Sequence, residues 1–261
     1  MTVQTDRAPT VGDLLRTWRQ RRRLTQLELA NSSEVSARHL SFVETGRARP
    51  TREMILHLSE HLEVPLRQRN EVLLAGGFAP VYPEHELSEA PMSVVSAAVN
   101  QLLDAHPYPA VVVDRHWELV ASNEPTALLL AGAASWLVEP PINVLRLSLH
   151  PEGMAPRIVN LAQWKAHLLG RLARQADVTG DPVLFALLDE LRSLPGGSPD
   201  EPLPRDSLVV PLRYRLASGL ELSMFSMTTV FGTPLDVTVS ELAIETFYPA
   251  SAETAAALVG S

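Results

Sequence analysis

The sequence predicts an all-α domain of five short helices, followed by an α+β domain with a five-stranded antiparallel sheet. Between residues 10 and 77, apolar residues recur at the i, i+3, i+4, i+7 spacing of amphipathic helices. The last third of the chain alternates apolar and polar residues in three runs split by turn residues, which is typical of antiparallel strands. A length of 261 residues is enough for two ordinary domains.

The composition limits the classes of protein that fit. No apolar run reaches the ~18 residues of a transmembrane helix, and the N-terminus has no signal-peptide pattern, so we expect a cytoplasmic protein with no membrane partner. The absence of cysteine excludes disulfides, thiol catalysis and cysteine zinc sites. The net charge of −8 divides into +3 over residues 1–80 and −11 over residues 81–261. This asymmetry indicates that the N-terminal part of the chain binds a polyanion.

Changes in pattern predict five segments. Residues 1–9 are polar and are expected to form a flexible N-terminal arm, and residues 10–77 form the helical domain. Prolines and acidic residues without periodicity mark residues 78–91 as a linker. The second domain is expected over residues 92–250, followed by a C-terminal tail over residues 251–261.

The helical domain carries clear start and stop signals. Thr10, Thr25 and Ser36 are placed to cap the first three helices, and Gly46 to close the third in the left-handed conformation. Apolar residues of the second and third helices are expected to lock the two together, namely Leu27, Ala30, Val35, Leu40 and Val43.

The second and third helices, joined by a four-residue turn, form the arrangement that places a recognition helix in the major groove of DNA. Arg38 is expected to contact guanine with two hydrogen bonds, and Ser36 and His39 to reach a base edge or a phosphate. Phosphate contacts are expected from the preceding helix and the following loop. The complete predicted DNA-binding set is Gln26, Ser36, Ala37, Arg38, His39, Phe42, Arg47 and Arg49.

The segment LTQLELANSSEVSARHLSFVETGRARPT resembles the lambda-repressor-like Cro/XRE family of helix-turn-helix regulators, and the similarity spans Val11 to Gly76. This resemblance implies sequence-specific binding to double-stranded operator DNA. Glu34 departs from the family pattern, because relatives usually have glycine at this turn, so a slightly strained or differently shaped turn is expected. Phe42 occupies a position where relatives often have a polar side chain that contacts bases. Two roles therefore stay open for Phe42, contact with a thymine methyl group and simple packing.

The second domain begins with a helical segment, MSVVSAAVNQLLDA, and two strands in PAVVVDRHWELVASN, joined by a tight turn at Asp114-Arg115. Three helical segments are expected next, in PTALLLAGAASWL, NLAQWKAHLLGRLARQA and PVLFALLDELRSL. The final strands are expected in LVVPLRYRL, LELSMFSMTTVF and LDVTVSELAIETFYP, as an antiparallel meander.

This domain is similar to the MmyB-like ligand-binding domain, on the residues YPAVVVDRHWELVASN, NVLRLSLHPEGMAPRIVNLAQW and ELAIETFYPA. The resemblance implies a PAS-like fold, with helices folded over one face of a five-stranded sheet and enclosing an apolar pocket. It also implies that the domain senses a small apolar molecule such as a fatty-acyl ligand. We expect no other cofactor.

Large or adaptable apolar residues are the candidates for lining this pocket, namely Trp117, Trp136, Trp164, Phe225, Met227 and Phe231. Arg157, with His150 and His167 nearby in sequence, is the candidate for holding a carboxylate head group. The same apolar residues could equally form an ordinary core, and Arg157 could equally form a structural salt bridge.

Three functions follow as alternatives. The first is a homodimeric regulator that binds a palindromic operator and responds to a small apolar ligand. The second is a DNA-binding regulator whose second domain recruits another protein without any ligand. The third is an enzyme fused to a DNA-binding module, which no cluster of titratable residues favours. His57 and His61 match an H-x-x-E-H zinc pattern, but the rest of that helix is committed to packing, so we predict no metal site and no catalytic residues.

Overall fold

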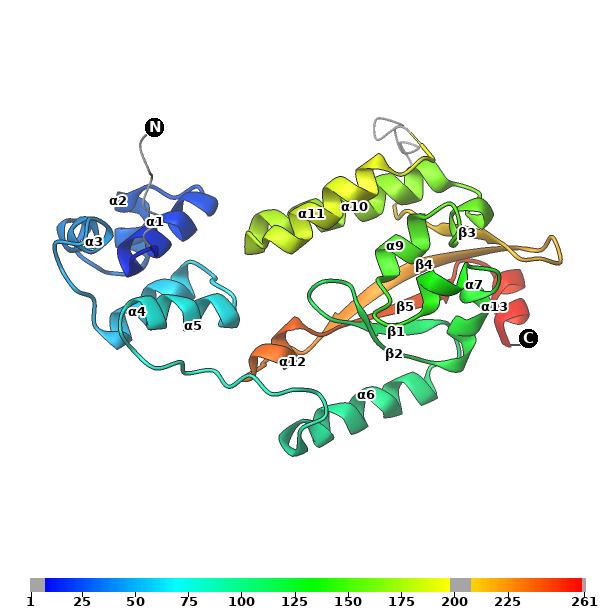
Figure 1. Ribbon diagram of the computed structural model, residues 1–261, viewed down its shortest axis with the longest axis horizontal. Coiled ribbons are helices and arrows are strands. Elements are labelled where there is room, and N and C mark those ends of the chain that lie inside the picture. Colours follow the sequence, from blue (N-terminus) through cyan, green and yellow to red (C-terminus); the bar gives the residue numbers. More distant parts are fainter. Residues whose placement is uncertain (1–7, 198–207, 260–261) are drawn as a thin grey trace. The chain divides into compact units, whose positions relative to one another are not determined.

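The computed structural model describes residues 8–197 and 208–259, and it divides into two compact units. The first unit comprises Met1–Glu84 and Leu235–Val237, and the second comprises His85–Pro234 and Thr238–Ser261 (Figure 1). The expected linker, residues 78–91, is therefore divided between the two units. Its first half is fixed to the helical unit, since Asn70 bonds the backbone of Val81 and Tyr82. Most of the expected N-terminal arm, residues 1–7, lies outside the described residues.

Five helices form the first unit, as expected from the apolar spacing. They are α1 (Val11–Arg21), α2 (Gln26–Ser32), α3 (Ala37–Glu44), α4 (Arg52–His61) and α5 (Leu66–Ala75). Their apolar faces meet in one core of buried residues, which includes Leu15, Trp18, Leu29, Leu40, Val43, Ile55, Leu58, Leu62 and Val72.

The helix boundaries follow the local signals. Thr10 forms a reciprocal capping box with Asp13, and Thr25 forms the same box with Glu28, so both predicted caps are confirmed. Ser36 occupies the N-cap position of α3, but its side chain makes no capping hydrogen bond. Gly46 follows α3 with a φ of 72°, in the left-handed conformation expected of a residue that ends a helix.

One expected core residue is not in the core. Leu27 is 61% exposed, whereas Leu29 and Ala30 of the same helix are buried. Two residues along an α-helix correspond to a rotation of about 200°. Leu27 therefore faces away from the side of α2 that Leu29 buries, and the prediction that it locks α2 to α3 was wrong.

Glu34, in the turn between α2 and α3, has a φ of 53°, which confirms the strained turn expected there. We predict that Glu34→Gly raises the free energy of unfolding of the first unit by about 0.5–1 kcal/mol, because glycine adopts this conformation without a Cβ clash. Amide hydrogen exchange of peptides from α1 to α5 in the full-length protein measures this change. Glu60→Gly, at an exposed position in the last turn of α4, should instead lower stability by up to about 1 kcal/mol. Equal losses for both variants would contradict the prediction.

A five-stranded antiparallel sheet with the order β2-β1-β5-β4-β3 forms the centre of the second unit. The strands are β1 (Ala110–Val113), β2 (Leu119–Ser122), β3 (Leu212–Arg215), β4 (Glu221–Val230) and β5 (Ala243–Pro249). The meander of the last three strands and the first hairpin are both confirmed. Because β5 pairs with β1, the two ends of the domain sequence meet in the middle of the sheet.

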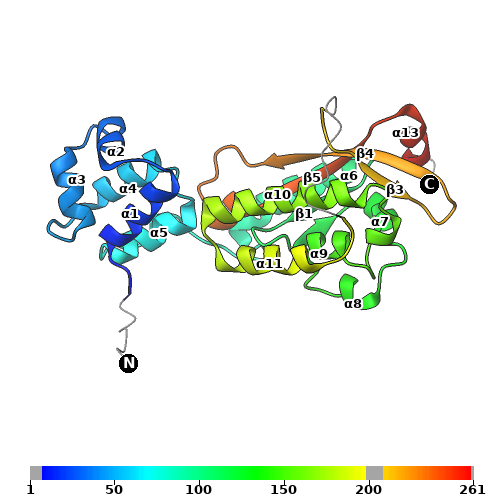
Figure 2. The ribbon, with the colours of Figure 1, turned by 90° about the horizontal axis from the view of Figure 1, so that it is seen from above.

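Helices cover both faces of this sheet, whereas the family resemblance implied helices over one face only (Figure 1). Successive residues of β1 explain this arrangement. Ala110 and Val112 pack in a cluster with α6, while Val111 and Val113 belong to the larger core on the opposite face. The helices are α6 (Ser93–Ala105) on the first face, and α7 (Ala127–Leu130), α8 (Ser135–Val138), α9 (Val144–Leu149), α10 (Leu161–Thr179) and α11 (Pro182–Ser193) on the second. Figure 2 shows α10 and α11 running side by side across the sheet.

Three segments of the second unit differ from the expectation. PTALLLAGAASWL was expected to be one helix, but it forms α7 and α8, separated at Gly132, which has a φ of 84°. The start of the last expected strand is a short helix, α12 (Val237–Glu241). The expected C-terminal tail contains α13 (Ala252–Val259), which buries Leu258 in the core. Short 3₁₀ turns occur at Ala90–Met92, Glu124–Thr126 and Ala155–Arg157.

Candidate DNA-binding surface and apolar cavity

The predicted DNA-reading residues lie at the start of α3 and in the loop after it. Ser36, Arg38, His39, Arg47 and Arg49 are exposed. The opposite face of α3 is fixed in the core by two buried residues, which are Leu40 and Val43. The core thus holds the helix while its polar end remains accessible, as readout in a major groove requires.

Phe42 connects two of these arginines. Its half-buried ring lies 5.4 Å from the guanidinium carbon of Arg38 and 6.0 Å from that of Arg47. Guanidinium groups at such distances are attracted by the ring quadrupole. Of the two roles left open for Phe42, packing therefore has direct support, since the ring helps to orient Arg38 and Arg47. Ala37, beside them on α3, is half-buried.

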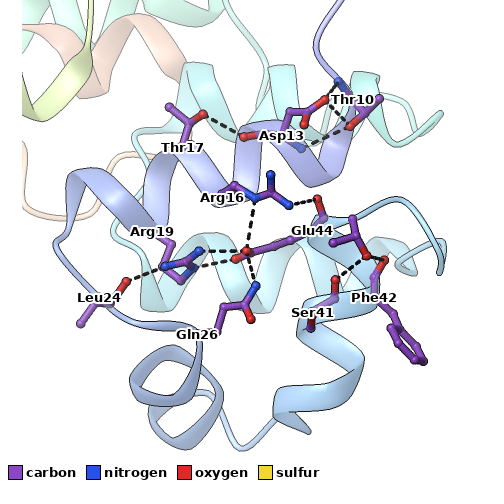
Figure 3. Close-up of polar contacts among 11 residues, drawn as sticks. Thr10, Asp13, Arg16, Thr17, Arg19, Leu24, Gln26, Ser41, Phe42 and Glu44 are labelled. Carbon is purple, nitrogen blue, oxygen red and sulfur yellow. Dashed lines mark hydrogen bonds and ion pairs between the residues drawn. The ribbon is translucent and has the colours of Figure 1, made fainter.

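Gln26 has a different partner from the expected phosphate. Its amide donates to Glu44 Oε2 at 2.8 Å, as Figure 3 shows. Arg19 also binds Glu44, with Nε to Oε1 at 2.7 Å and Nη2 to Oε2 at 2.9 Å. Arg16 adds an ion pair at 3.6 Å and a hydrogen bond from Nη2 to the Glu44 carbonyl at 2.8 Å. The side chain of Gln26 thus stabilises the module that carries α3, because a buried carboxylate must have its acceptors satisfied.

The Glu44 cluster, defined as Arg16, Arg19, Gln26 and Glu44, joins α1, α2 and the end of α3 (Figure 3). Glu44 is only 2% exposed. Burial by itself would raise the pKa of this carboxyl, but the hydrogen bonds from Arg19 and Gln26 and the charges of Arg19 and Arg16 outweigh burial and lower the pKa. The charged form of Glu44 is therefore the form that the fold stabilises.

The second unit contains an apolar cavity between the sheet and the helices α9 and α10. The cavity has a volume of about 70 Å³ and is partly open to solvent. Most of the lining is apolar, and it includes Val111, Trp117, Leu119, Leu129, Leu145, Leu147, Met154, Trp164, Leu168, Leu212 and Phe247. A largely apolar cavity with a few polar groups is the usual form of a small-molecule site.

Two of the seven predicted ligand-binding residues line this cavity, Trp117 and Trp164. The other five lie elsewhere. Trp136 is half exposed and its Nε1 donates to Glu152, and Met227 is also half exposed. The remaining three contact other parts of the unit: Phe225 stacks on Tyr248, Phe231 packs against the cluster under α6, and Arg157 donates to the carbonyl of Ala131.

Trp117 has an unusual backbone conformation in the loop that joins β1 and β2. Its φ is 67°, in the left-handed region that large side chains rarely adopt. Its indole donates to Gln175 Oε1 at 2.8 Å, and its carbonyl accepts from the N–H of Val144 at 2.9 Å. These bonds fix the ring between α10 and the start of α9, so the tryptophan forms a rigid part of the cavity wall.

Two charged residues line the cavity that were not among the predicted site residues, Arg171 and Glu245. Arg171 lies seven residues after Trp164 and thus on the same face of α10. Glu245 lies between Ala243 and Phe247, which pack against the core on the same face of β5. A carboxylate at an inward position of an alternating strand needs a buried cation, and this signal could have revealed the pair.

The described residues contain no group of three or more histidine, cysteine, aspartate or glutamate side chains that could hold a metal ion. His57 and His61, of the rejected zinc pattern, make local contacts instead. His57 Nε2 bonds to the Ser33 carbonyl at 2.7 Å, and His61 Nδ1 bonds to the His57 carbonyl at 2.9 Å. Within the described part of the chain, no helix is long and apolar enough to cross a membrane.

An accessible, arginine-bearing recognition helix in one unit and an apolar cavity in the other define a DNA-binding regulator with a ligand-binding domain. A family model of a helix-turn-helix domain matches residues 10–72. The model of the MmyB-like transcription regulator ligand binding domain matches residues 95–259, more than half of the chain, and the protein belongs to this family. Both resemblances are thereby confirmed, and both families are regulatory rather than enzymatic. A comparison with curated proteins gives no match.

Proposed function

We propose that this regulator binds operator DNA through α3 and senses a small apolar molecule, such as one with a fatty-acyl chain, in the cavity of its second unit. The observation that carries this proposal is the cavity itself. Its lining is mostly apolar and includes two tryptophans that are themselves buried, Trp117 and Trp164. A domain that only recruited another protein would need no such space, because a filled core is more stable than one with a cavity.

The regulator acts as a homodimer on a palindromic operator. One recognition helix contacts only a few base pairs, and pairing two half-sites supplies the remaining affinity and specificity. Ligand binding changes the separation or orientation of the two recognition helices and so shifts the affinity for DNA. Such coupling is typically about 1–3 kcal/mol, which corresponds to about 5- to 150-fold in affinity.

Native mass spectrometry of the purified full-length protein, followed by denaturing extraction, tests the sensing function. We expect a reproducible extra mass that corresponds to one amphiphilic compound per chain. Adding the extracted compound to the stripped protein should then change its affinity for operator DNA, measured by fluorescence anisotropy. A protein that carries no compound, and whose DNA affinity no added amphiphile changes, would favour the protein-recruitment alternative.

We predict that Arg38→Ala relaxes the base preference at one position of each half-site. Loss of a bidentate contact to guanine costs about 1–3 kcal/mol of discrimination at that base pair. Selection of bound duplexes from a random pool measures the preference for wild type and variant. Arg47→Ala is the matched comparison, since loss of a phosphate contact should weaken binding to all sequences alike. An unchanged base preference in Arg38→Ala would contradict the assignment of α3 as the helix that recognises the base sequence.

A further inference from the structure

An ion pair lies in the wall of the cavity. Arg171 of α10 binds Glu245 of β5, with Nη1 to Oε2 at 3.0 Å and Nη2 to Oε1 at 2.6 Å. The side chains of Arg171 and Glu245 are 20% and 5% exposed. Thr228 completes the group, because its hydroxyl accepts from Arg171 Nη2 at 2.9 Å and donates to Glu245 Oε1 at 2.8 Å. The guanidinium also lies 5.0 Å from the ring centre of Trp117.

This ion pair is the charged part of the cavity wall. Arg171 and Glu245 are the only charged side chains among the described lining residues, and the other polar ones are Thr126, Ser148 and Ser226. A ligand with an apolar chain would therefore place its head group against the pair, where hydrogen-bonding groups are concentrated. Arg171 makes three hydrogen bonds within the group, and a guanidinium has five N–H donors. The other two donors, one on Nε and one on Nη1, make no hydrogen bond within this group.

The charge balance of the pair decides which head group fits. The positive charge of Arg171 is already neutralised by Glu245 at hydrogen-bond distance. A carboxylate head group would add a second negative charge beside Glu245 in a poorly solvated space, and like charges so placed repel each other strongly. A neutral group that both donates and accepts can accept from Arg171 and donate to Glu245 without disturbing the pair.

From this geometry we infer that the cavity selects amphiphiles with a neutral hydrogen-bonding head group, such as a primary amide or an alcohol, over free carboxylic acids. This inference rests on the proposed sensing of an apolar ligand and names its chemical class. It replaces the expectation that Arg157 binds a carboxylate, since Arg157 does not line the cavity.

Isosteric pairs of amphiphiles test this selectivity. Hexanamide, decanamide and tetradecanamide are compared with the carboxylates of the same chain length by isothermal titration calorimetry on the full-length protein at neutral pH. Amide and carboxylate have the same shape and chain, so their difference in affinity reports the head group alone. We expect the best amide to bind at least about tenfold more tightly than its carboxylate.

Substitution of the Glu245 side chain should reverse the order of affinity between amide and carboxylate ligands. Glu245→Gln removes the competing negative charge and leaves Arg171 to pair with the ligand, so the carboxylate should then bind more tightly than the amide. Glu221→Gln is the matched control, because Glu221 forms an ion pair with Arg213 at 2.6 Å in the same sheet but does not line the cavity. This control should keep the wild-type order.

The outcomes separate the inference from the function on which it rests. Carboxylates that bind wild type as tightly as the amides would overturn the head-group inference and leave apolar sensing intact. Failure of every amide and every carboxylate to bind would overturn the sensing proposal itself. The wild-type comparison decides the inference even if Glu245→Gln does not fold.

Discussion

Replacing Glu44 with glutamine should destabilise the first unit by about 3–5 kcal/mol, the usual cost of removing one partner from a buried ion pair. In the native protein the carboxylate of Glu44 accepts two hydrogen bonds from Arg19 and one from Gln26. Glutamine removes the negative charge and leaves the Arg19 guanidinium, which is largely buried, without a counter-ion. The loss approaches the whole stability of many small domains, so operator binding should weaken as α3 loses its support.

Amide hydrogen exchange of the full-length protein measures this effect separately for each unit. Peptides from α1, α2 and α3 should lose protection in Glu44→Gln, while peptides from the sheet of the second unit should not change. Glu60→Gln, at an exposed position of α4, is the matched control and should change stability by less than about 0.5 kcal/mol. Unchanged protection of α1 to α3 in Glu44→Gln would show that the ion pair contributes nothing to the fold.

The lowered pKa of Glu44 predicts that the stability of the first unit depends on pH. Because the folded protein lowers the pKa of Glu44, the stabilisation is fully present above the pKa of an unfolded glutamate, about 4.3. It is lost as pH falls from that value through the lower pKa of the folded state. Denaturant unfolding of the first unit should therefore show stability that declines with acid in wild type, with a smaller decline in Glu44→Gln over the same range.

The helices of the first unit could be predicted because their signals are local. A threonine followed three residues later by an acidic residue starts both α1 and α2, and each helix then shows its own apolar spacing. The partner of Gln26 could not be predicted in this way. Glu44 lies 18 residues further along the chain, and only the packing of α2 against α3 brings the two side chains together.

The sheet of the second unit was also predictable, because alternation of apolar and polar residues is a property of each strand. The cavity lining depends instead on which face of the sheet α10 covers. Size and polarity alone do not distinguish Trp164, which lines the cavity, from Trp136, which lies half exposed beside Glu152. The face of each helix and the register of each strand predict the lining better than size and polarity do. Arg171 shares a face of α10 with Trp164, and Glu245 shares a face of β5 with Phe247.

Asn123→Ala should destabilise the second unit by about 3 kcal/mol, because several buried polar groups share this one side chain. Its Oδ1 accepts from the N–H of Ala110 at 2.9 Å and from the hydroxyl of Thr126 at 2.9 Å. Its Nδ2 donates to the carbonyls of His106 at 3.0 Å and Tyr108 at 2.7 Å. The amide thus joins the end of α6 to the start of β1, and alanine would leave two carbonyls without this donor.

Chemical denaturation with hydrogen exchange as the readout separates this effect from a general loss of helix or sheet. In Asn123→Ala, protection should fall first in β1 and the end of α6, and amphiphile binding should weaken because β1 carries Val111 into the cavity wall. Asn100→Ala deletes the same amide from an exposed position of α6, and it should cost less than about 0.5 kcal/mol. Equal stability of the two variants would mean that water satisfies the groups around Asn123, and the junction between α6 and β1 would then not depend on its side chain.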